Sequence, residues 1–345
     1  MKFITNSEAS LNIPDTLYAM QQKNLLYNGI FKYFSNQEID DGSVIFNHPD
    51  GWIYSNKGEN GQIAQADAAC RIVVNNVGNT MSLSQALHEF PRWKEYLKGK
   101  TVTVDVNVVL KKHTSVKISL TDRVTDIEHN KVIQEDGTYL FKLQLDMAQQ
   151  AKGLFLTISS ATKEAVIEIL SVYGNVGKTA IETLPLMVNG IIGERKQYIA
   201  TQTAPAEELS LCFQTPYELT KDQSRLNSVI NGRFGLGDNG FSLLPNVRGY
   251  FSRVWDNSSS TDPDAKERKP FPEGSVTGDK VGTLQDDEFT QHQHDLLFSL
   301  AEPITIGEGA PAKGLIAEPH SKTQASGGKE TRPKNFSELY TIRWS

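Results

Sequence analysis

The sequence contains little of what marks secreted, membrane-spanning or disulfide-bonded proteins. Its 345 residues include only two cysteines, Cys70 and Cys212, which lie far apart in the chain. Disulfides belong mainly to oxidising compartments, so we predict two reduced core thiols rather than a disulfide. Residues 1–20 lack the basic start and apolar run of a secretory signal. No stretch approaches the roughly 20 apolar residues that a membrane-spanning helix needs.

Positive charge is also scarce. Lysine and arginine number 35 against 41 acidic residues, which gives a formal net charge of −6 and a pI near 5.7. Binding to nucleic acid through phosphates depends on clustered basic residues, and no polybasic run is present. We therefore predict no nucleic-acid partner and no attachment to an anionic membrane surface.

Catalytic signatures are missing as well. The chain has neither a G-x-S-x-G nor an H-E-x-x-H motif, so no catalytic residue is predicted and no enzyme is expected. Residues 235–240 match G-x-G-x-x-G, but Pro245 prevents the helix that a dinucleotide site requires, which favours a tight turn. Residues 174–179 end like a phosphate-binding loop, yet Val172 stands where the first glycine belongs.

Strand patterns dominate the first half of the chain. In residues 100–110, valines at every second position alternate with polar residues, which predicts a strand with one buried face. The same alternation recurs in four further segments, residues 115–120, 139–145, 154–158 and 166–170. The polar link 111–114 favours a hairpin between the first two strands. Short strands without long helices indicate a β-sandwich, with at most one short helix in residues 87–97.

The composition changes after about residue 225. From residue 232 onward the chain is rich in glycine, proline, asparagine and aspartate, and the alternation fades. A segment this irregular needs more than a two-layer core to hold it, and trimerisation or metal binding would serve. We place a domain boundary near residue 222.

One pair of histidines in this segment has the spacing of metal ligands. His292 and His294 are separated by one residue, so on an extended strand both rings would face the same side. Three chains around an axis would supply six nitrogens, which suits an octahedral transition metal better than tetrahedral zinc. Taken alone, such a pair on a polar loop is more often plain surface, so the neighbouring motifs decide between the two interpretations.

The C-terminal third resembles the tail-collar and tail-fibre tip family of tailed phages and phage-derived particles. Residues 243–253, LLPNVRGYFSR, resemble the family's LPNLRGxFxR segment, and Trp255 with Asp256 follows as its WD pair. Val254 stands where the family has glycine. The remaining matches occur in the family's order and are residues 262–265 with Arg268, 278–286, 292–294, 327–335 and 339–342.

This resemblance implies an intertwined homotrimer at the distal end of a fibre. It assigns His292 and His294 to one iron-like divalent ion per trimer, because similar motifs from three chains bind iron octahedrally in the family. A ladder of ions is not implied, since the chain has a single H-x-H motif. The interval 295–326, including His320, corresponds to the part that varies in the family and often contacts the receptor, so we predict receptor or glycan binding there.

The N-terminal part resembles the jelly-roll β-sandwich of carbohydrate-binding modules. The matching segments are NLLYNGIF at 24–31, PDGW at 49–52, LSQ at 83–85, LKGKTVT at 97–103 and EELSLCF at 207–213. Lys32 stands where many modules have a glutamate tied to calcium, so a calcium site is doubtful here. Trp52 and Tyr54 are candidates for stacking on a sugar ring. The alternative is that Trp52 fills the sandwich core.

These patterns predict a mainly β fold, in which an N-terminal jelly-roll β-sandwich precedes an intertwined, loop-rich trimeric tip. The predicted segments are an attachment segment at 1–20, the sandwich at 21–222 and a receptor-binding tip domain at 223–345. The expected function is attachment of a virion tail, made in the host cytoplasm, to a bacterial surface glycan or outer-membrane protein. The expected partners are two further copies of the chain and tail or baseplate proteins. The alternatives are a glycan depolymerase and a purely structural collar or adaptor.

Overall fold

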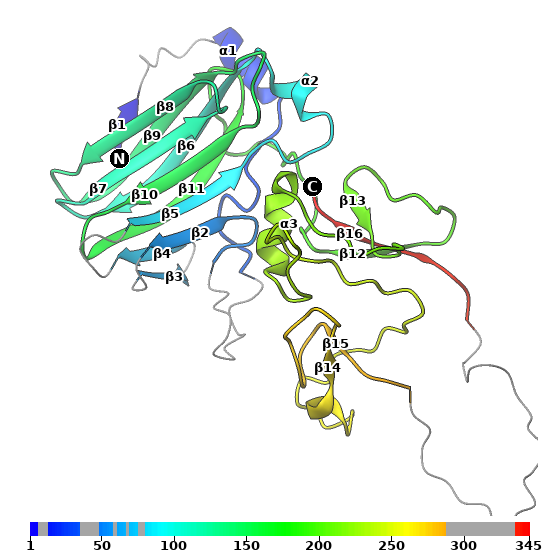
Figure 1. The fold of residues 1–345 in the computed structure, drawn as a ribbon. Helices are drawn as coiled ribbons and strands as arrows, with labels where there is room; N and C mark the ends of the chain where they lie inside the picture. Colours follow the sequence, from blue (N-terminus) through cyan, green and yellow to red (C-terminus); the bar gives the residue numbers. More distant parts are fainter. Residues whose placement is uncertain (6–12, 35–47, 58–60, 67–68, 75–79, 288–334) are drawn as a thin grey trace, which may run out of the picture. The chain divides into compact units, whose positions relative to one another are not determined.

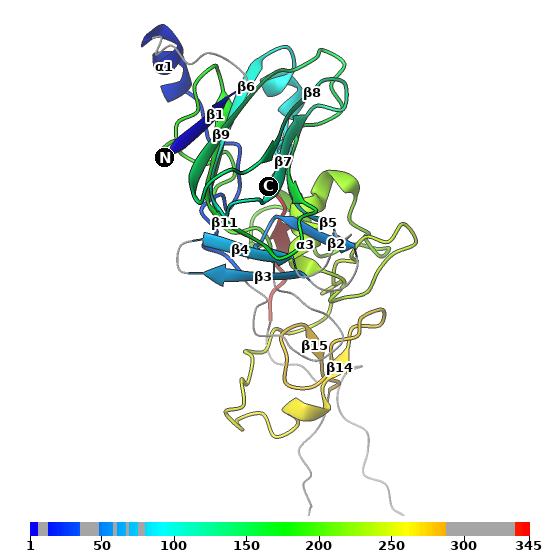
Figure 2. The ribbon, with the colours of Figure 1, turned by 90° about the vertical axis from the view of Figure 1, so that its left-hand side faces the viewer.

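Two layers of β-strands form the N-terminal part of the chain in the computed structural model (Figures 1 and 2). The structure describes residues 1–5, 13–34, 48–57, 61–66, 69–74, 80–287 and 335–345. It divides into two compact units, one of Met1–Leu284 with Glu338–Ser345 and the other of Gln285–Ser337. All described helices and strands belong to the first unit.

The first layer is a six-stranded sheet in the order β1-β9-β6-β11-β4-β3. Its strands are β1 (Lys2–Thr5), β3 (Gly61–Ala66), β4 (Ala69–Val74), β6 (Thr101–Leu110), β9 (Gly137–Asp146) and β11 (Ala165–Val176). Neighbouring strands are antiparallel, except that β1 runs parallel to β9 at one edge. The register of β11 against β6 shifts between Ile169 and Ser171, which marks an irregularity of the bulge type.

The second layer is a five-stranded sheet in the order β2-β5-β10-β7-β8. Its strands are β2 (Ile53–Lys57), β5 (Thr80–Ala86), β7 (Ser115–Thr121), β8 (Asp126–Val132) and β10 (Phe155–Ser160). All of its neighbours are antiparallel. The two sheets face each other in Figure 2, and the mainly β fold with an N-terminal jelly-roll sandwich is confirmed.

The core of the sandwich lies between the two sheets. The alternating valines of β6, at positions 102, 104, 106 and 108, are fully buried and belong to one large apolar cluster. Alternate residues of β7, β9 and β10 are buried in the same way. Burial of one aliphatic or aromatic side chain contributes roughly 1.5–3 kcal/mol. The two-residue period of the sequence therefore accounts for which face of each strand turns inward.

The predicted hairpin between residues 100–110 and 115–120 is wrong. β6 pairs with β9 and β11, whereas β7 pairs with β8 and β10 in the other sheet. The link between them, in which the Thr114 N–H donates to the Lys111 carbonyl at 3.2 Å, carries the chain from one sheet to the other. Alternation shows that a strand has one buried face. It does not show whether the next strand lies beside it or opposite it.

Helices in the sandwich part are short. α1 (Ile13–Met20) buries only Ala19. α2 (Trp93–Leu97) falls within the predicted segment 87–97 and buries Leu97. No described helix is long and apolar enough to cross a membrane.

The rest of the first unit, residues 185–284 with 338–345, is called the C-terminal region here. It contains a three-stranded sheet in the order β12-β16-β13, whose strands are β12 (Arg195–Tyr198), β13 (Glu208–Ser210) and β16 (Leu339–Arg343). It also contains α3 (Ser224–Ile230), the short 3-10 turns Lys221–Gln223 and Ala265–Glu267, and a ribbon of β14 (Lys269–Pro270) with β15 (Thr283–Leu284). A small apolar cluster includes Leu226, Leu244 and Ile342.

Two buried charged residues, Glu89 and Arg225, join the sandwich to α3 through hydrogen bonds to the backbone. Arg225 and Glu89 are both almost inaccessible to solvent. The Glu89 carboxylate accepts the backbone N–H groups of Ser224 at 2.7 Å and Arg225 at 2.9 Å, while the Arg225 guanidinium donates to the carbonyls of Glu89 and Leu25, both at 3.2 Å. Burial raises the pKa of Glu89 and lowers that of Arg225, and the charge of each opposes the shift of the other.

The two glycine-containing motifs have no helix after them. Residues 235–240 form a turn, in which Gly235 and Gly240 both have positive φ. Residues 174–176 belong to the end of β11. The prediction against a dinucleotide site at residues 235–240 rested on this missing helix, whereas that for residues 174–179 rested on Val172 in place of the first glycine. Both cysteines are free thiols, with Cys70 fully buried and Cys212 half-buried, in agreement with the prediction.

Candidate functional site

Trp52 lies in the sandwich core. Its side chain is 0% exposed, and its ring centre lies 5.4 Å from that of Phe31. The indole N–H donates to the carbonyl of Asn28 at 3.3 Å, which satisfies the one polar atom of the ring. A sugar cannot reach either face of a ring buried in this way. The prediction that Trp52 stacks on a sugar is therefore wrong, and its alternative, that Trp52 fills the core, is correct.

Tyr54 lies two residues after Trp52, and its side chain points toward the same side of the chain, as expected for an extended backbone. It is half-buried and packs against the sandwich core, while Ile53 between them is exposed. Its hydroxyl is buried and has no hydrogen-bond partner among the described residues. Burial also raises the pKa of this hydroxyl. Tyr54 thus does not present an open ring face to a sugar.

The other predicted site residues lie outside the described residues. These are His292, His294 and the interval 295–326 with His320. The predictions for metal and receptor binding at these positions stay predictions. Among the residues that the structure does describe, no group of three or more histidine, cysteine or acidic side chains is placed to hold a metal ion.

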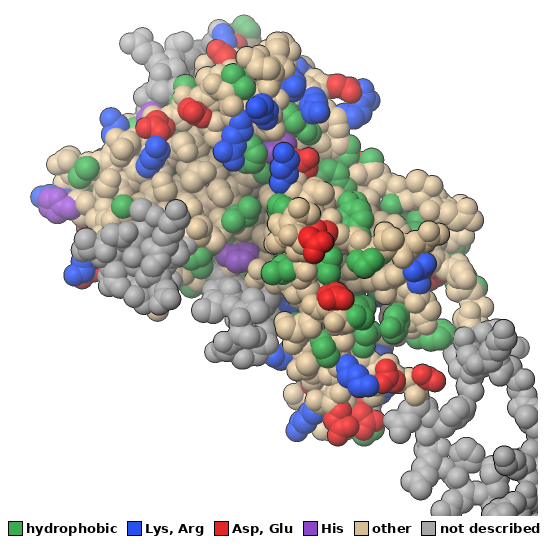
Figure 3. Space-filling view, in the orientation of Figure 1, with side chains coloured by type: hydrophobic (Ala, Val, Ile, Leu, Met, Phe, Trp, Pro, Cys, Tyr) green, Lys and Arg blue, Asp and Glu red, His purple; other side chains and the backbone are tan. Residues whose placement is uncertain are grey.

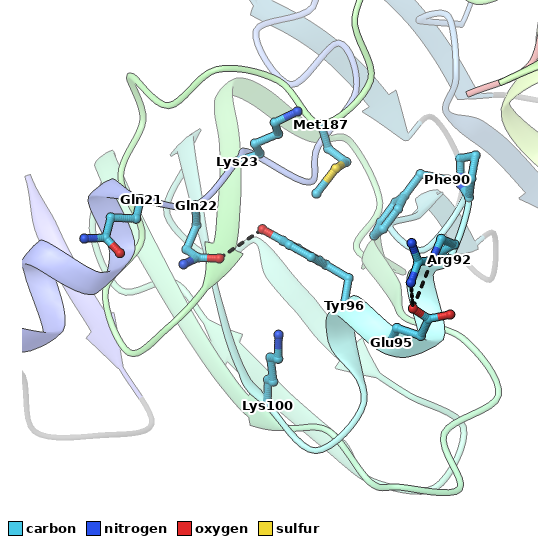
Figure 4. Close-up of a pocket in the computed structure, with 10 residues that line it drawn as sticks. Gln21, Gln22, Lys23, Phe90, Arg92, Glu95, Tyr96, Lys100 and Met187 are labelled. Atoms are coloured by element: carbon cyan, nitrogen blue, oxygen red, sulfur yellow. Dashed lines mark hydrogen bonds and ion pairs between the residues drawn. The ribbon is translucent and has the colours of Figure 1, made fainter. Parts of the chain in front are cut away.

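A cavity of about 480 Å³ opens beside α2 and was not predicted from the sequence. Its lining comes from three stretches of chain, which are residues 21–23, residues 90–100 and Met187. Figure 4 shows Tyr96 in the middle of the lining side chains, with Gln22 at its hydroxyl end. In the same view Lys100 lies below Tyr96, and Lys23 and Met187 lie above it. The volume is typical of small-molecule sites.

The segment between β5 and β6 positions the wall of this cavity. Its apolar side chains Phe90 and Leu97 are buried in the sandwich core and anchor the segment at both ends of α2. Arg92 has a φ of 60°, a left-handed conformation that turns the chain sharply into α2. Tyr96 is left half-buried on the cavity side, with its ring centre 5.8 Å from that of Phe90 in an edge-to-face contact.

Polar contacts hold the Tyr96 ring in place. Its hydroxyl donates to Gln22 Oε1 at 3.0 Å, and burial raises its pKa, so the hydroxyl is protonated at neutral pH. Lys100 Nζ lies 5.2 Å from the centre of the ring, within the range of a cation–π contact. The cavity therefore has an aromatic wall fixed by an amide on one side and a cation on the other.

Cations outnumber anions around the cavity. Lys23, Arg92 and Lys100 line it, and Glu95 is the single carboxylate among the lining residues. Glu95 forms an ion pair with Arg92, whose hydrogen bond lowers the pKa of the carboxyl. The neighbouring Lys94 and Lys98 lie over Trp93. Figure 3 shows lysine and arginine side chains gathered on this side of the molecule.

The sequence carried a partial signal for this cavity. Residues 92–100 read RWKEYLKGK, with four basic and two aromatic residues beside one acidic residue. This run is too short and too mixed to count as polybasic. The cavity depends equally on residues 21–23 and Met187, which only the fold brings to the same place.

Comparison with known proteins gives partial similarities. No family model matches the chain. Protein RhiB of Rhizobium leguminosarum bv. viciae is 32% identical over 126 residues, which cover 34% of this chain and 56% of that protein. The chain thus spans about half the length of this curated relative.

The solved structures that resemble the chain are more distant in sequence. The enzymatically active domain of tailspike protein 4 from bacteriophage CBA120 is 14% identical with a TM-score of 0.33, and the match covers 44% of this chain and 21% of that one. The CBM22-1 xylan-binding domain of Paenibacillus barcinonensis is 13% identical with a TM-score of 0.30, and the match covers 46% and 97%. At such values the similarity says nothing about what this chain binds. A proposal for its ligand must therefore rest on the residues of the chain itself.

Proposed function

We propose that the chain is a receptor-binding protein of a phage-type tail that attaches the particle to a bacterial surface glycan. The observation that carries the glycan part is the cavity beside α2, where Tyr96, Gln22 and Lys100 line one space. Aromatic faces suit the C–H-rich faces of sugars, and amide and ammonium groups suit sugar hydroxyls. No chemical step on the receptor belongs to this proposal.

The tail part rests on the motifs of the C-terminal third and gains support from their surface. The segment that matches the family's first block carries apolar side chains into solvent, with Phe251 63% exposed and Val254 91% exposed. Tyr250 and Trp255 are about half exposed beside them. Isolated exposed apolar residues are common, but a run of them marks an interaction surface. In an intertwined homotrimer this run would be covered by the other two copies.

Two further elements of the proposal concern partners and metal. We assign contact with tail or baseplate proteins to residues 1–20, where Phe3, Ile13, Leu17 and Met20 are exposed. We also assign one iron-like ion per trimer to His292 and His294. Elemental analysis of the purified trimer is expected to give one metal per three chains. Well under that ratio would contradict the metal assignment.

The proposal is tested by adsorption of the full-length chain to a panel of bacteria. We expect the protein to bind susceptible cells, to compete with particles that carry it, and to lose binding when the surface polysaccharide is stripped. Tyr96→Ala should weaken the binding by roughly tenfold, or about 1.4 kcal/mol, as expected for an aromatic anchor. Tyr96→Phe, which keeps the ring, is the matched control and should bind nearly as well as the parent chain.

Three outcomes would contradict the proposal. Absence of adsorption across the panel would remove the receptor-binding function. Adsorption that survives the stripping of polysaccharide would remove the glycan. Release of reducing ends from bound polysaccharide would show that the protein acts on its receptor rather than only holding it.

A further inference from the structure

We propose that the cavity beside α2 selects saccharides that carry an anionic group, a carboxylate or a phosphate, over neutral ones. This inference rests on the proposed function and adds the chemical class of its ligand. It comes from the distribution of charge around the cavity, from the fixed aromatic wall, and from the single acidic side chain that competes for one of the cations.

The two lysines that line this cavity differ from several others in the sandwich part. Some lysines elsewhere are paired with carboxylates, as in Lys2 with Glu135, Lys111 with Asp136 and Lys117 with Glu128. Neither Lys23 nor Lys100 has an ion pair with a carboxylate among the described residues. Two ammonium groups without a carboxylate partner that line one concave space attract an anion.

The aromatic wall gives the site its preference for a ring-shaped ligand. Tyr96 is held by Gln22 at its hydroxyl, by the edge of Phe90 and by the ammonium group of Lys100. A side chain fixed before binding loses little conformational entropy when the ligand arrives. A sugar ring that packs beside Tyr96 would place a charged substituent within reach of Lys100 or Lys23. A free inorganic anion has no ring that could pack beside Tyr96.

A substitution of Glu95 tests the charge hypothesis directly. It is the one carboxylate in the lining, and it neutralises Arg92 through their ion pair. An anionic ligand must compete with Glu95 for Arg92, whereas a neutral ligand does not. Removing the negative charge of Glu95 should therefore strengthen the binding of an acidic saccharide and leave a neutral one nearly unchanged.

Nucleic acid, another polyanion, fits the molecule less well. The cations are confined to one cavity of about 480 Å³, which accommodates one or two sugar rings and not a duplex. Binding of a DNA duplex at physiological salt with an affinity equal to that of the polysaccharide would overturn the assignment to a glycan.

The first experiment removes the charge from the ligand. Surface polysaccharide is purified from a strain to which the full-length chain adsorbs. One portion is left native, one has its carboxylates reduced to alcohols, and one is dephosphorylated with hydrofluoric acid. Calorimetric titration should show a Kd at least about tenfold weaker for one of the treated portions. The treatment that has this effect identifies the anionic group.

The second experiment removes charge from the protein. The double variant Lys23→Gln with Lys100→Gln should lose about tenfold in affinity for the native polysaccharide, while Glu95→Gln should gain severalfold. Lys131→Gln is the matched control, because Lys131 is an exposed lysine of β8 outside the cavity lining. Melting temperatures within a few degrees of the parent would show that the variants are folded.

The results separate this inference from the proposed function. If the chain binds the native polysaccharide but neither treatment nor the charge variants change the Kd, charge selection is wrong and glycan binding stands. If the chain adsorbs to no cells at all, the proposed function itself is wrong. Opposite effects of the lysine and glutamate variants on the acidic ligand, with no effect of Lys131→Gln, would establish charge selection.

Discussion

The sandwich and the C-terminal region are held together in different ways. The sandwich has a large aliphatic and aromatic cluster between two sheets, formed by strands of regular alternation. The C-terminal region has a much smaller cluster and short strands. Its buried carboxylates hold it together through ion pairs and hydrogen bonds. Asp262 binds Arg268 at 3.2 Å and Arg253 at 3.3 Å, and Glu208 binds Lys196 at 3.0 Å and Tyr198 at 2.9 Å.

The difference shows how one chain can combine a self-contained apolar core with a region that leaves apolar side chains in solvent. Apolar packing needs no partner, so the sandwich buries its own hydrophobic residues. The C-terminal region keeps Phe251 and Val254 in solvent and relies on polar contacts for its shape. A region built in this way can hold its backbone in place while leaving apolar surface exposed, as the proposed homotrimer requires.

The largest effect is expected where the two regions meet. Arg225→Met should lower the free energy of unfolding by about 3–5 kcal/mol, because it leaves Glu89 buried without its partner charge. Calorimetric unfolding should then show two transitions in place of one. Lys221→Met, at an exposed position just before α3, is the control. A single transition at the parent temperature would mean that the contacts of Arg225 and Glu89 do not couple the regions.

A core truncation in each region compares the two kinds of packing. Leu143→Ala in the sandwich should cost about 3–4 kcal/mol, since its surroundings are rigid and cannot close the space. Leu244→Ala, in the small C-terminal cluster, should cost about 2 kcal/mol, because looser surroundings relax into the space. Urea denaturation measures both values. Equal losses would mean that the two cores are packed equally well.

The pH dependence of the sandwich is expected to come partly from His88. Burial lowers the pKa of this side chain from 6.5 to about 4 in the folded chain. Below pH 6.5, His88 therefore binds a proton in the unfolded chain, whereas in the folded chain it stays neutral until the pH approaches 4. The contribution of His88 to the free energy of unfolding is fully present above pH 6.5 and is lost as the pH falls toward 4. The loss amounts to about 2 kcal/mol at pH 5.

His88→Gln removes this contribution and keeps an acceptor for the Leu154 N–H, which His88 Nδ1 binds at 3.1 Å. The loss of stability between pH 7 and pH 5 should be about 2 kcal/mol smaller in the variant than in the parent. Burial raises the pKa of Asp105 to about 6, so the contribution of Asp105 to stability changes with pH in the opposite direction. Because the parent and the variant both contain Asp105, comparing their pH profiles removes this contribution. Parallel pH profiles would refute the role of His88.

The smallest effect on unfolding is expected at the exposed surface of the C-terminal region. Phe251→Ser should change the free energy of unfolding of a single chain by no more than about 0.5 kcal/mol. The same variant should weaken trimer formation, measured by light scattering over a range of concentrations. Ile53→Ser, at an exposed position of the sandwich, is the control and should leave the trimer intact. A Phe251→Ser protein that assembles like the parent would exclude this surface from the interface.

The parts of the fold that follow local patterns could be predicted from the sequence. The alternation of residues 100–110 identified the buried face of β6, and the lack of a helix after residues 235–240 followed from Pro245. Pairing could not be predicted in the same way. The link 111–114 is as compatible with a crossing between sheets as with a hairpin, because both bury the same faces.

The candidate site was harder to predict because it depends on contacts between distant residues. Nothing near Tyr96 in the sequence points to Gln22 or Met187, and nothing near Glu89 points to Arg225. The prediction for Trp52 followed an aromatic residue in a family motif, but the residue serves the core of that fold. Whether such an aromatic side chain is buried depends on its neighbours in space, which a short motif does not specify.

The position of β16 has a consequence for how the chain folds. This strand lies between β12 and β13, although both precede it by most of the C-terminal third. The sandwich can form from hairpins such as β3–β4 and β7–β8, whose strands are close in sequence. The three-stranded sheet must instead close a long loop before any of its hydrogen bonds form, which slows folding. We therefore expect refolding in two phases, a fast one for the sandwich and a slow one in which β16 arrives last.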